Sequence, residues 1–336
     1  MGPPVLRFFS RALSLFIVAA AAAAAAGWWW VHEPLRLNAP TVDLSIEPGT
    51  LPRGVAQAVK DAGVDVNPDW LYYWFRASGQ GRAIKAGSYE LEAGITPRTL
   101  LAKLARGEES LRAVTLVEGW TFRQLRAALA KEDQLKPDSR PLTDEAIMAQ
   151  LGRAGVHPEG RFFPDTYTYA KGSSDIAVLR RALRAMDKHL AQAWEHRSPR
   201  ALAKSPDEAL ILASIVEKET GKAVDRPMVS AVFNNRLRVG MPLQTDPTVI
   251  YGMGAAFDGN LRRKDLQADT PWNTYTRPGL PPTPISMPGK ASLMAAVHPA
   301  ESDALYFVAR GDGTSHFSAS LDEHNRAVNK YQRKQQ

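Results

Sequence analysis

The chain has 336 residues, enough for two domains and an accessory segment, and its 44% hydrophobic and 23% charged residues are typical of a globular protein. It has no cysteine, which excludes disulfides, thiolate catalysis and cysteine metal sites. The formal net charge of +7 suits an anionic partner, whether a membrane surface, a cell-wall polymer or a nucleic acid.

The N-terminus carries an uncharged apolar stretch at residues 12–31, about the length that crosses a hydrocarbon core. Arg7 and Arg11 precede it, which predicts that residues 1–11 are cytoplasmic, and the tryptophans at 28–30 are typical of an interfacial belt. We expect a retained single-pass transmembrane helix. The alternative is a signal peptide cleaved in the alanine run, although the tryptophans extend the apolar stretch past it. Either way the remainder lies outside the cytoplasm, so no nucleic-acid partner is expected.

A linker at residues 32–41 is followed by a strand–turn–helix pattern that occurs three times, at residues 42–63, 87–107 and 111–132. These repeats predict a small α+β module over residues 42–131.

Within this module the second repeat gives the clearest helix signals. Thr96 is a candidate N-cap, Pro97 fits the first helical turn, and Gly107 fits the C-terminal stop. Residues 68–77, “PDWLYYWFRA”, are predicted to form a short helix rich in aromatics. Core packing is the favoured role for these aromatics, and a sugar-stacking face is the alternative.

Residues 132–336 predict a larger mixed α+β domain, so the fold class of the chain is α+β. Helices are expected at 175–195 and 205–221, and a hairpin around 311–313 precedes a terminal helix. The segment 241–288 is rich in Gly, Pro, Asn, Thr and Asp and is too irregular for a simple core. No metal-ligand spacing, phosphate-binding loop or serine nucleophile elbow is evident, so neither a metal nor a cofactor is expected.

Two glutamates end an apolar run in “ILASIVEKET”, at positions 217 and 219. At about 100° per residue, Glu219 falls on the same helical stripe as Leu212, Ile215 and Val216. Glu217 points away from that stripe, toward solvent or another domain. Because burial disfavours an ionised carboxyl, Glu219 is the candidate general acid. The structural alternative is that Glu219 pairs with a basic residue such as Arg226 or Arg236.

The irregular segment offers polar side chains suited to the hydroxyl and N-acetyl groups of an amino sugar. The group comprises Asn235, Gln244, Thr245, Asp246, Tyr251, Asn273, Thr274 and Tyr275. Together they predict a rigid polar groove typical of a polysaccharide site, in which only a few residues contact substrate.

Several longer motifs resemble the endolytic murein transglycosylases, the YceG-like family of the bacterial inner membrane, and they occur in family order from the anchor to the terminal helix. The motifs are “VEGWT”, “EGRFFPDTYTY”, “SIVEKET”, “FNNRL”, “LQTDPTVIYG”, “NTYT”, “GLPPTPI” and “HPA…LYFVA”.

The resemblance implies cleavage of peptidoglycan between N-acetylmuramic acid (MurNAc) and N-acetylglucosamine (GlcNAc) inside strands, leaving 1,6-anhydro-MurNAc ends. It implies an inner-membrane protein with a periplasmic catalytic domain at residues 132–336 and a LysM-like module at 42–131. In lytic transglycosylases a small hydroxyl residue follows the catalytic glutamate, which matches Glu219 and Thr220. Gln244, Asn273 and Tyr275 are the candidates for positioning the sugar. The family further implies cooperation with peptidoglycan synthases in ending nascent strands.

Two other functions stay open at the level of the sequence. Asp246, or less favourably Asp165, is a candidate second carboxylate for a peptidoglycan hydrolase. A catalytically idle, membrane-anchored peptidoglycan-binding protein belongs to a different class, which loss of the buried glutamate would have favoured.

Overall fold

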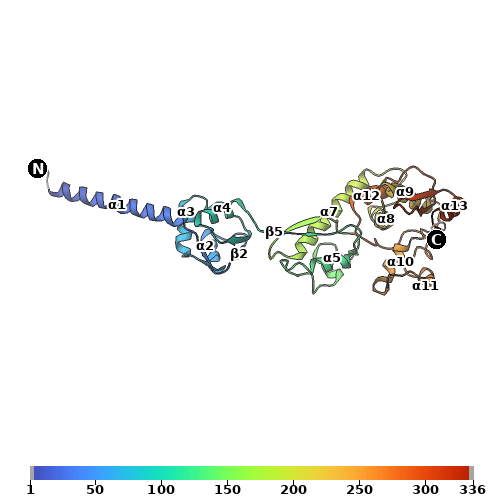
Figure 1. Ribbon diagram of the computed structural model, residues 1–336, viewed down its shortest axis with the longest axis horizontal. Helices are drawn as coiled ribbons and strands as arrows, with labels where there is room; N and C mark the ends of the chain where they lie inside the picture. Colours follow the sequence, from blue (N-terminus) through green and yellow to red (C-terminus); the bar gives the residue numbers. More distant parts are fainter. Residues whose placement is uncertain (1–3, 333–336) are drawn as a thin grey trace. The chain divides into compact units, whose positions relative to one another are not determined.

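The computed structural model describes residues 4–332, with side chains from residue 13 onward (Figure 1). The predicted cytoplasmic segment, residues 1–11, therefore lies outside the described side chains. The chain forms two compact units, residues 1–112 with 170–172 (unit 1) and residues 113–169 with 173–336 (unit 2).

This border differs from the one expected at residue 131, because the third repeat does not stay with the first two. Its strand β5 (Leu111–Thr115) pairs with β6 (Thr166–Ala170), a partner about 50 residues further along the chain. Its helix α5 (Phe122–Leu129) buries Leu125 in the same core as Leu179 of unit 2.

Unit 1 contains the N-terminal helix, two pairs of short strands and three further α-helices. Its elements are α1 (Pro4–His32), β1 (Arg36–Leu37), β2 (Thr41–Ile46), α2 (Pro52–Asp61), β3 (Val64–Asp65), α3 (Pro68–Ala77), the 3-10 helix η1 (Gly81–Ala83), β4 (Gly87–Glu92) and α4 (Pro97–Arg106).

Helix α1 is the one helix among the described residues that is long and apolar enough to cross a membrane, over Leu13–His32. Its side chains are exposed until the last turn, where Val31 is buried and Trp30 packs against the core of unit 1. A core helix of a soluble protein would instead be mostly buried. The mixed α+β fold with an N-terminal apolar helix is thus confirmed.

The core of unit 1 lies between its strands and helices, and its local signals agree with the predictions. Residues in β2 alternate between exposed and buried, and β2 pairs antiparallel with β4 so that Leu44 faces Tyr89. Helix α4 begins at the Thr96 cap, whose hydroxyl accepts a hydrogen bond from the backbone N–H of Thr99. It ends at Gly107, whose φ of 73° is the left-handed conformation that glycine adopts most readily. The predicted cap, first turn and stop of this helix are confirmed.

Unit 2 is predominantly helical, with a terminal hairpin. After β5, α5 and β6, already given, its elements are α6 (Asp144–Gln150), α7 (Asp175–Glu195), α8 (Pro206–Glu219), η2 (Ala223–Asp225), α9 (Arg226–Arg238), α10 (Asp246–Met253), η3 (Gly254–Ala256), α11 (Arg263–Gln267), α12 (Lys290–Val297), β7 (Tyr306–Ala309), β8 (Ser315–Ser318) and α13 (Leu321–Tyr331).

Helix α8 is the centre of unit 2. It packs against α7, α9, α10 and α12, and Figure 1 shows it beside α9 and α12. Every residue from 209 to 216 is buried, so α8 has no solvent-facing side over this stretch. The C-terminal end of a helix enclosed on all sides is a rigid support for the residue that follows its buried run.

Candidate active site

A cavity of about 280 Å³ in unit 2 surrounds the end of α8. It brings together side chains from α8, α9, α10, β7, α13 and two loops, which are far apart in the sequence. Its lining residues are Glu219, Phe233, Arg236, Leu243, Gln244, Thr245, Asp246, Tyr275, Phe307 and His324.

Glu219 is the last residue of α8, and its partly buried carboxyl faces this cavity. One carboxyl oxygen, Oε1, accepts a hydrogen bond from the hydroxyl of Thr245. Burial raises the pKa of Glu219 above its ordinary value and outweighs the lowering by the Thr245 hydrogen bond. The negative end of the α8 dipole also disfavours the ionised form. The geometry thus holds a carboxyl group that stays protonated at higher pH than a free glutamate would.

The charges around Glu219 act on it in opposite directions. The Asp246 carboxylate raises the pKa of Glu219, and the Arg236 guanidinium lowers it. Arg236 is itself buried and donates to the backbone carbonyls of Leu305 (2.7 Å) and Leu243 (2.8 Å). Among the described residues no basic side chain forms an ion pair with Glu219, so the simple pairing that was the structural alternative is not observed.

The loop before α10 supplies three consecutive lining residues. Thr245 is the N-cap of α10 but makes no side-chain capping hydrogen bond, which leaves its hydroxyl free to donate to Glu219. Its backbone N–H donates a hydrogen bond to the hydroxyl of Thr274 (3.1 Å). The hydroxyl of Thr248 donates to the backbone carbonyl of Thr245 and is also hydrogen-bonded to the hydroxyl of Thr274. Gln244 has a φ of 50°, in the left-handed region that residues other than glycine seldom adopt. Strain of this kind concentrates at functional sites.

Tyr275 and Asn273 lie on the neighbouring loop but differ in exposure. The Tyr275 hydroxyl donates to Asp246 Oδ1 at 2.6 Å and lines the cavity. Asn273 is fully buried, and its amide donates to backbone carbonyls, including that of Ala268 at 2.7 Å. Its carbonyl oxygen accepts the backbone N–H of Tyr275 (2.9 Å). Contact between Asn273 and a sugar stays a prediction, and its surroundings favour the role of holding Tyr275 in place.

Glu217 does not face solvent, contrary to the expectation from the helical stripe. Its side chain is only 8% exposed, and Oε2 accepts the backbone N–H of Gly289 (2.9 Å) just before α12. Arg226 lies 3.8 Å from its other oxygen. The expectation failed because the loop before α12 covers the side of α8 from which Glu217 projects. Glu217 therefore anchors the start of α12 and does not line the cavity.

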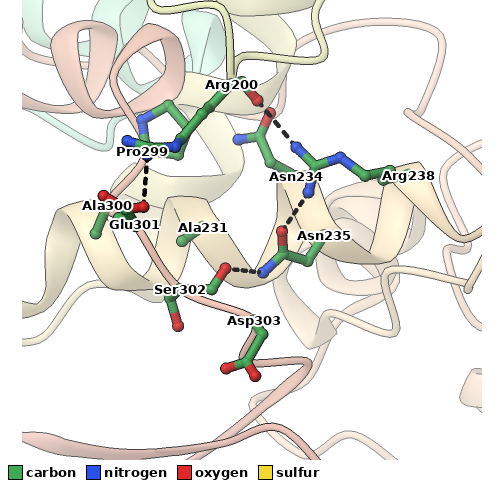
Figure 2. A pocket seen from close by; sticks show the side chains of 10 residues that line it. All are labelled: Arg200, Ala231, Asn234, Asn235, Arg238, Pro299, Ala300, Glu301, Ser302 and Asp303. Carbon is green, nitrogen blue, oxygen red and sulfur yellow. Dashed lines mark hydrogen bonds and ion pairs between the residues drawn. The ribbon is translucent and has the colours of Figure 1, made fainter.

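Four of the eight polar residues singled out in the sequence do not line this cavity: Asn273, already described, Thr274, Asn235 and Tyr251. Asn235 lines a separate cavity of about 440 Å³, where it donates to the carbonyl oxygen of Ser302 (2.8 Å) and accepts from Arg238 (2.6 Å) (Figure 2). Tyr251 forms a hydrogen bond with the buried Glu159. Asp165 is exposed and is not among the residues that line the Glu219 cavity.

His324, Phe307 and Phe233 were not predicted as site residues. His324 comes from the terminal helix α13, stacks on Tyr306 with ring centroids 5.2 Å apart, and has its pKa lowered by burial. Phe233 and Phe307 contact each other edge to face across α9 and β7. Phe233 and Phe307 lie within the motifs “FNNRL” and “HPA…LYFVA”, but nothing in those motifs marks them as cavity residues. Only the tertiary fold brings β7 and α13 to the end of α8.

The fold and the site together describe a general class of protein. It is a mixed α+β protein with one apolar N-terminal helix and a cavity that holds a partly buried, protonatable carboxyl group. The sequence profile of the YceG-like family matches residues 44–330. The chain belongs to the YceG-like family.

Named relatives and a solved structure agree with this membership. The chain is 32% identical over 308 residues to the endolytic murein transglycosylase of Bacillus subtilis strain 168, covering 87% of this chain and 85% of that protein. It is 27% identical over 323 residues to the endolytic murein transglycosylase of Streptococcus pneumoniae D39, covering 85% of this chain and 58% of that protein. The crystal structure of a YceG-like protein from Listeria monocytogenes matches with a TM-score of 0.56 and 30% identity, over 85% of this chain and 98% of that one.

Proposed function

We propose that this chain is an endolytic murein transglycosylase that uses Glu219 as its single acid and base. It cleaves the bond between MurNAc and GlcNAc inside peptidoglycan strands. The protonated Glu219 donates to the glycosidic oxygen as the C1–O bond breaks through an oxocarbenium-like state. The resulting carboxylate then takes the proton from the MurNAc C6 hydroxyl, whose oxygen bonds to C1. No water is consumed, so the second carboxylate of a glycosidase is not needed.

The observation that carries this proposal is the environment of Glu219. A general acid must hold its proton at the working pH, and burial at the end of α8 raises the pKa of this carboxyl. The family membership and the names of the relatives supply the substrate class. Gln244 and Tyr275, which line the same cavity, are proposed to position the sugar, and Asn273 is proposed to act through Tyr275.

The products distinguish this proposal from its alternatives. We expect peptidoglycan incubated with the full chain in detergent to yield 1,6-anhydro-MurNAc ends, each lighter by one water than a hydrolysis product, in mass spectra. The full chain is preferable to a truncation after His32, because Trp30 packs against the core of unit 1.

A hydrolase is the second candidate, and it is favoured by the presence of Asp246 in the same cavity. Reducing ends in the spectra would support it, and Asp246→Asn would then be expected to abolish cleavage. Binding without cleavage would support the catalytically idle anchor. Either result would overturn the transglycosylase proposal.

The hydrogen bond from Thr245 to Glu219 gives a pH prediction. The bond favours the ionised carboxyl and lowers the pKa, so Thr245→Val is expected to raise the pKa of Glu219 further. A hydrogen bond to a charged group contributes about 1.5–3 kcal/mol, and one pKa unit is about 1.4 kcal/mol. Since the acid must be protonated, the alkaline limb of the kcat profile should move up by about one pH unit or more. Thr245→Ser keeps the hydroxyl and should leave that limb in place, whereas a downward shift in Thr245→Val would contradict the role given to Glu219.

Helix α1 is proposed to be a retained membrane anchor with its N-terminus in the cytoplasm and units 1 and 2 in the periplasm. The apolar stretch of 20 residues exceeds the 7 to 15 apolar residues typical of a signal peptide. Unit 1 is proposed to be a LysM-like module, in keeping with the paired strands β2 and β4 that enclose α2 and α3 in sequence. Cooperation with peptidoglycan synthases in ending nascent strands is proposed on the family resemblance alone.

A further inference from the structure

A third cavity, of a different character, lies within unit 1. It is an open groove of about 890 Å³ between the last turns of α1 and the outer face of α3. One wall is formed by small residues of the apolar helix, Ala23 and Gly27, and the other by Trp70 and Tyr73 of α3. Arg98 of α4 lies at one end of the lining.

Two aromatic residues of this groove, Trp70 and Tyr73, lie outside the core, whereas the favoured prediction of core packing holds for Phe75 and Trp74 of the same helix. Trp70 is 60% exposed and Tyr73 is 61% exposed, whereas Leu71 and Phe75 of the same helix are fully buried. Helix α3 is therefore apolar on both faces. With the exposed Trp28, which lines the same groove, the outer face of α3 forms an apolar patch of a kind that soluble monomers seldom leave in water.

The end of α1 is fixed to unit 1 rather than joined to it by a loose linker. Trp30 contacts Trp70 edge to face, with ring centroids 6.0 Å apart. The His32 side chain is hydrogen-bonded to Arg98 at 2.9 Å, and the backbone N–H of Leu35 donates to the carbonyl of Ile95 at 2.8 Å. The depth of Trp30 in a membrane therefore determines the depth of Trp70.

From these contacts we infer that the groove binds the acyl chains of phospholipids in the outer leaflet of the membrane, with Arg98 at the level of the phosphate groups. The inference rests on the proposed membrane anchor. Ala23 lies about 10 Å further into the apolar span than Trp30, at 1.5 Å per residue. A groove that reaches from Trp70 to Ala23 thus begins at the interface, where tryptophan and tyrosine are favoured, and ends among acyl chains.

The same geometry argues against a glycan strand in this groove. Exposed aromatics also stack on sugars, but here one wall is the spanning helix itself. A polar glycan would have to enter the hydrocarbon region to reach that wall. In the bilayer, an acyl chain can contact both the small-residue wall of α1 and the aromatic wall of α3.

The test uses the natural absence of cysteine from the chain. Single cysteines are introduced in the full chain as Tyr73→Cys, Ala20→Cys and Ser45→Cys, and each is labelled with an environment-sensitive fluorophore. The protein is reconstituted in phosphatidylethanolamine–phosphatidylglycerol vesicles with or without phospholipids brominated on the acyl chains. Ala20 reports on insertion of α1. Ser45 lies exposed on β2, which Figure 1 draws within unit 1 away from the end of α1.

Bromolipids are expected to quench most of the emission at position 73, as at position 20, and to leave position 45 unchanged. Quenching at 20 without quenching at 73 would overturn the lipid groove while the anchor stands. Absence of quenching at 20 would overturn the anchor itself. Two further results at position 73 would also overturn the inference. Blue-shifted emission that bromolipids do not quench would indicate that a second copy of the chain covers the groove. Shielding of the fluorophore from solvent only when peptidoglycan is added would indicate a glycan site.

Discussion

Glu219→Gln is expected to abolish peptidoglycan cleavage while the protein keeps its fold. Glutamine has nearly the same shape and can still accept the hydroxyl hydrogen bond of Thr245, but it has no proton to donate to the glycosidic oxygen. General acid catalysis contributes roughly 100- to 10,000-fold, so we expect a loss of at least that order in the rate of anhydro-product formation. Mass spectrometry of digested sacculi measures the rate, and far-UV circular dichroism checks the fold.

The matched control is Glu217→Gln, two residues earlier on the same helix. Glutamine can still accept the backbone N–H of Gly289, and the position does not line the cavity. The substitution also leaves the largely buried Arg226 without its carboxylate partner, so stability is expected to fall by up to about 3 kcal/mol, which circular dichroism must show to be compatible with the fold. Substantial activity should remain. An equal loss of activity in both variants would contradict the assignment of Glu219, and unfolding of Glu219→Gln alone would support a structural role.

The sequence predicted the local structure of unit 1 well because its signals are local. Alternation of Val42, Leu44 and Ile46 marks a strand with one buried face, and the cap and stop of α4 lie within the helix or one residue from its ends. The border between the units was harder to predict, because it depends on the pairing of β5 with β6 across about 50 residues.

The residues of the cavity differ in the same way: those marked by their own helix could be predicted, and those brought in by distant elements could not. The stripe argument singled out Glu219, whose carboxyl lies partly buried in the cavity at the end of α8. It failed for Glu217 because it assumed one buried face, whereas the loop before α12 covers the side of α8 from which Glu217 projects. His324 enters the cavity from α13, about 100 residues after Glu219, and a single sequence carries no signal for that approach.

The second large expected effect concerns the buried carboxyl of Glu159, whose ionisation should change the stability of unit 2 rather than the rate of cleavage. Its side chain is buried, accepts the backbone N–H of Phe122 at 3.0 Å, and shares a hydrogen bond with Tyr251 of α10. Burial raises the pKa of Glu159 from 4.5 to about 7. Between these values the folded protein binds more protons than the unfolded chain, so stability falls as pH rises. At about 1.4 kcal/mol per unit, the loss by pH 8 is about 3 kcal/mol.

Glu159→Gln cannot ionise and should lack this part of the pH dependence. Between pH 5 and pH 8 the free energy of opening of the variant is therefore expected to rise by about 2.5 kcal/mol relative to that of the natural protein. Amide hydrogen exchange of peptides from α10, in the full chain in detergent, measures that free energy within unit 2. Other groups with raised pKa, such as Glu219, are present in both proteins and cancel in the difference.

Glu301→Gln is the control, since that carboxylate is 80% exposed and should show no such gain. If Glu159→Gln follows the same pH dependence as the natural protein, the carboxyl is not held protonated by burial. If the gain is found, the effect reaches the candidate active site, because Tyr251 lies on α10, the helix that begins with Asp246 and is capped by Thr245. Ionisation of Glu159 near pH 7 would then loosen the wall that supplies the hydrogen bond to Glu219, which links the stability of unit 2 to the chemistry proposed for it.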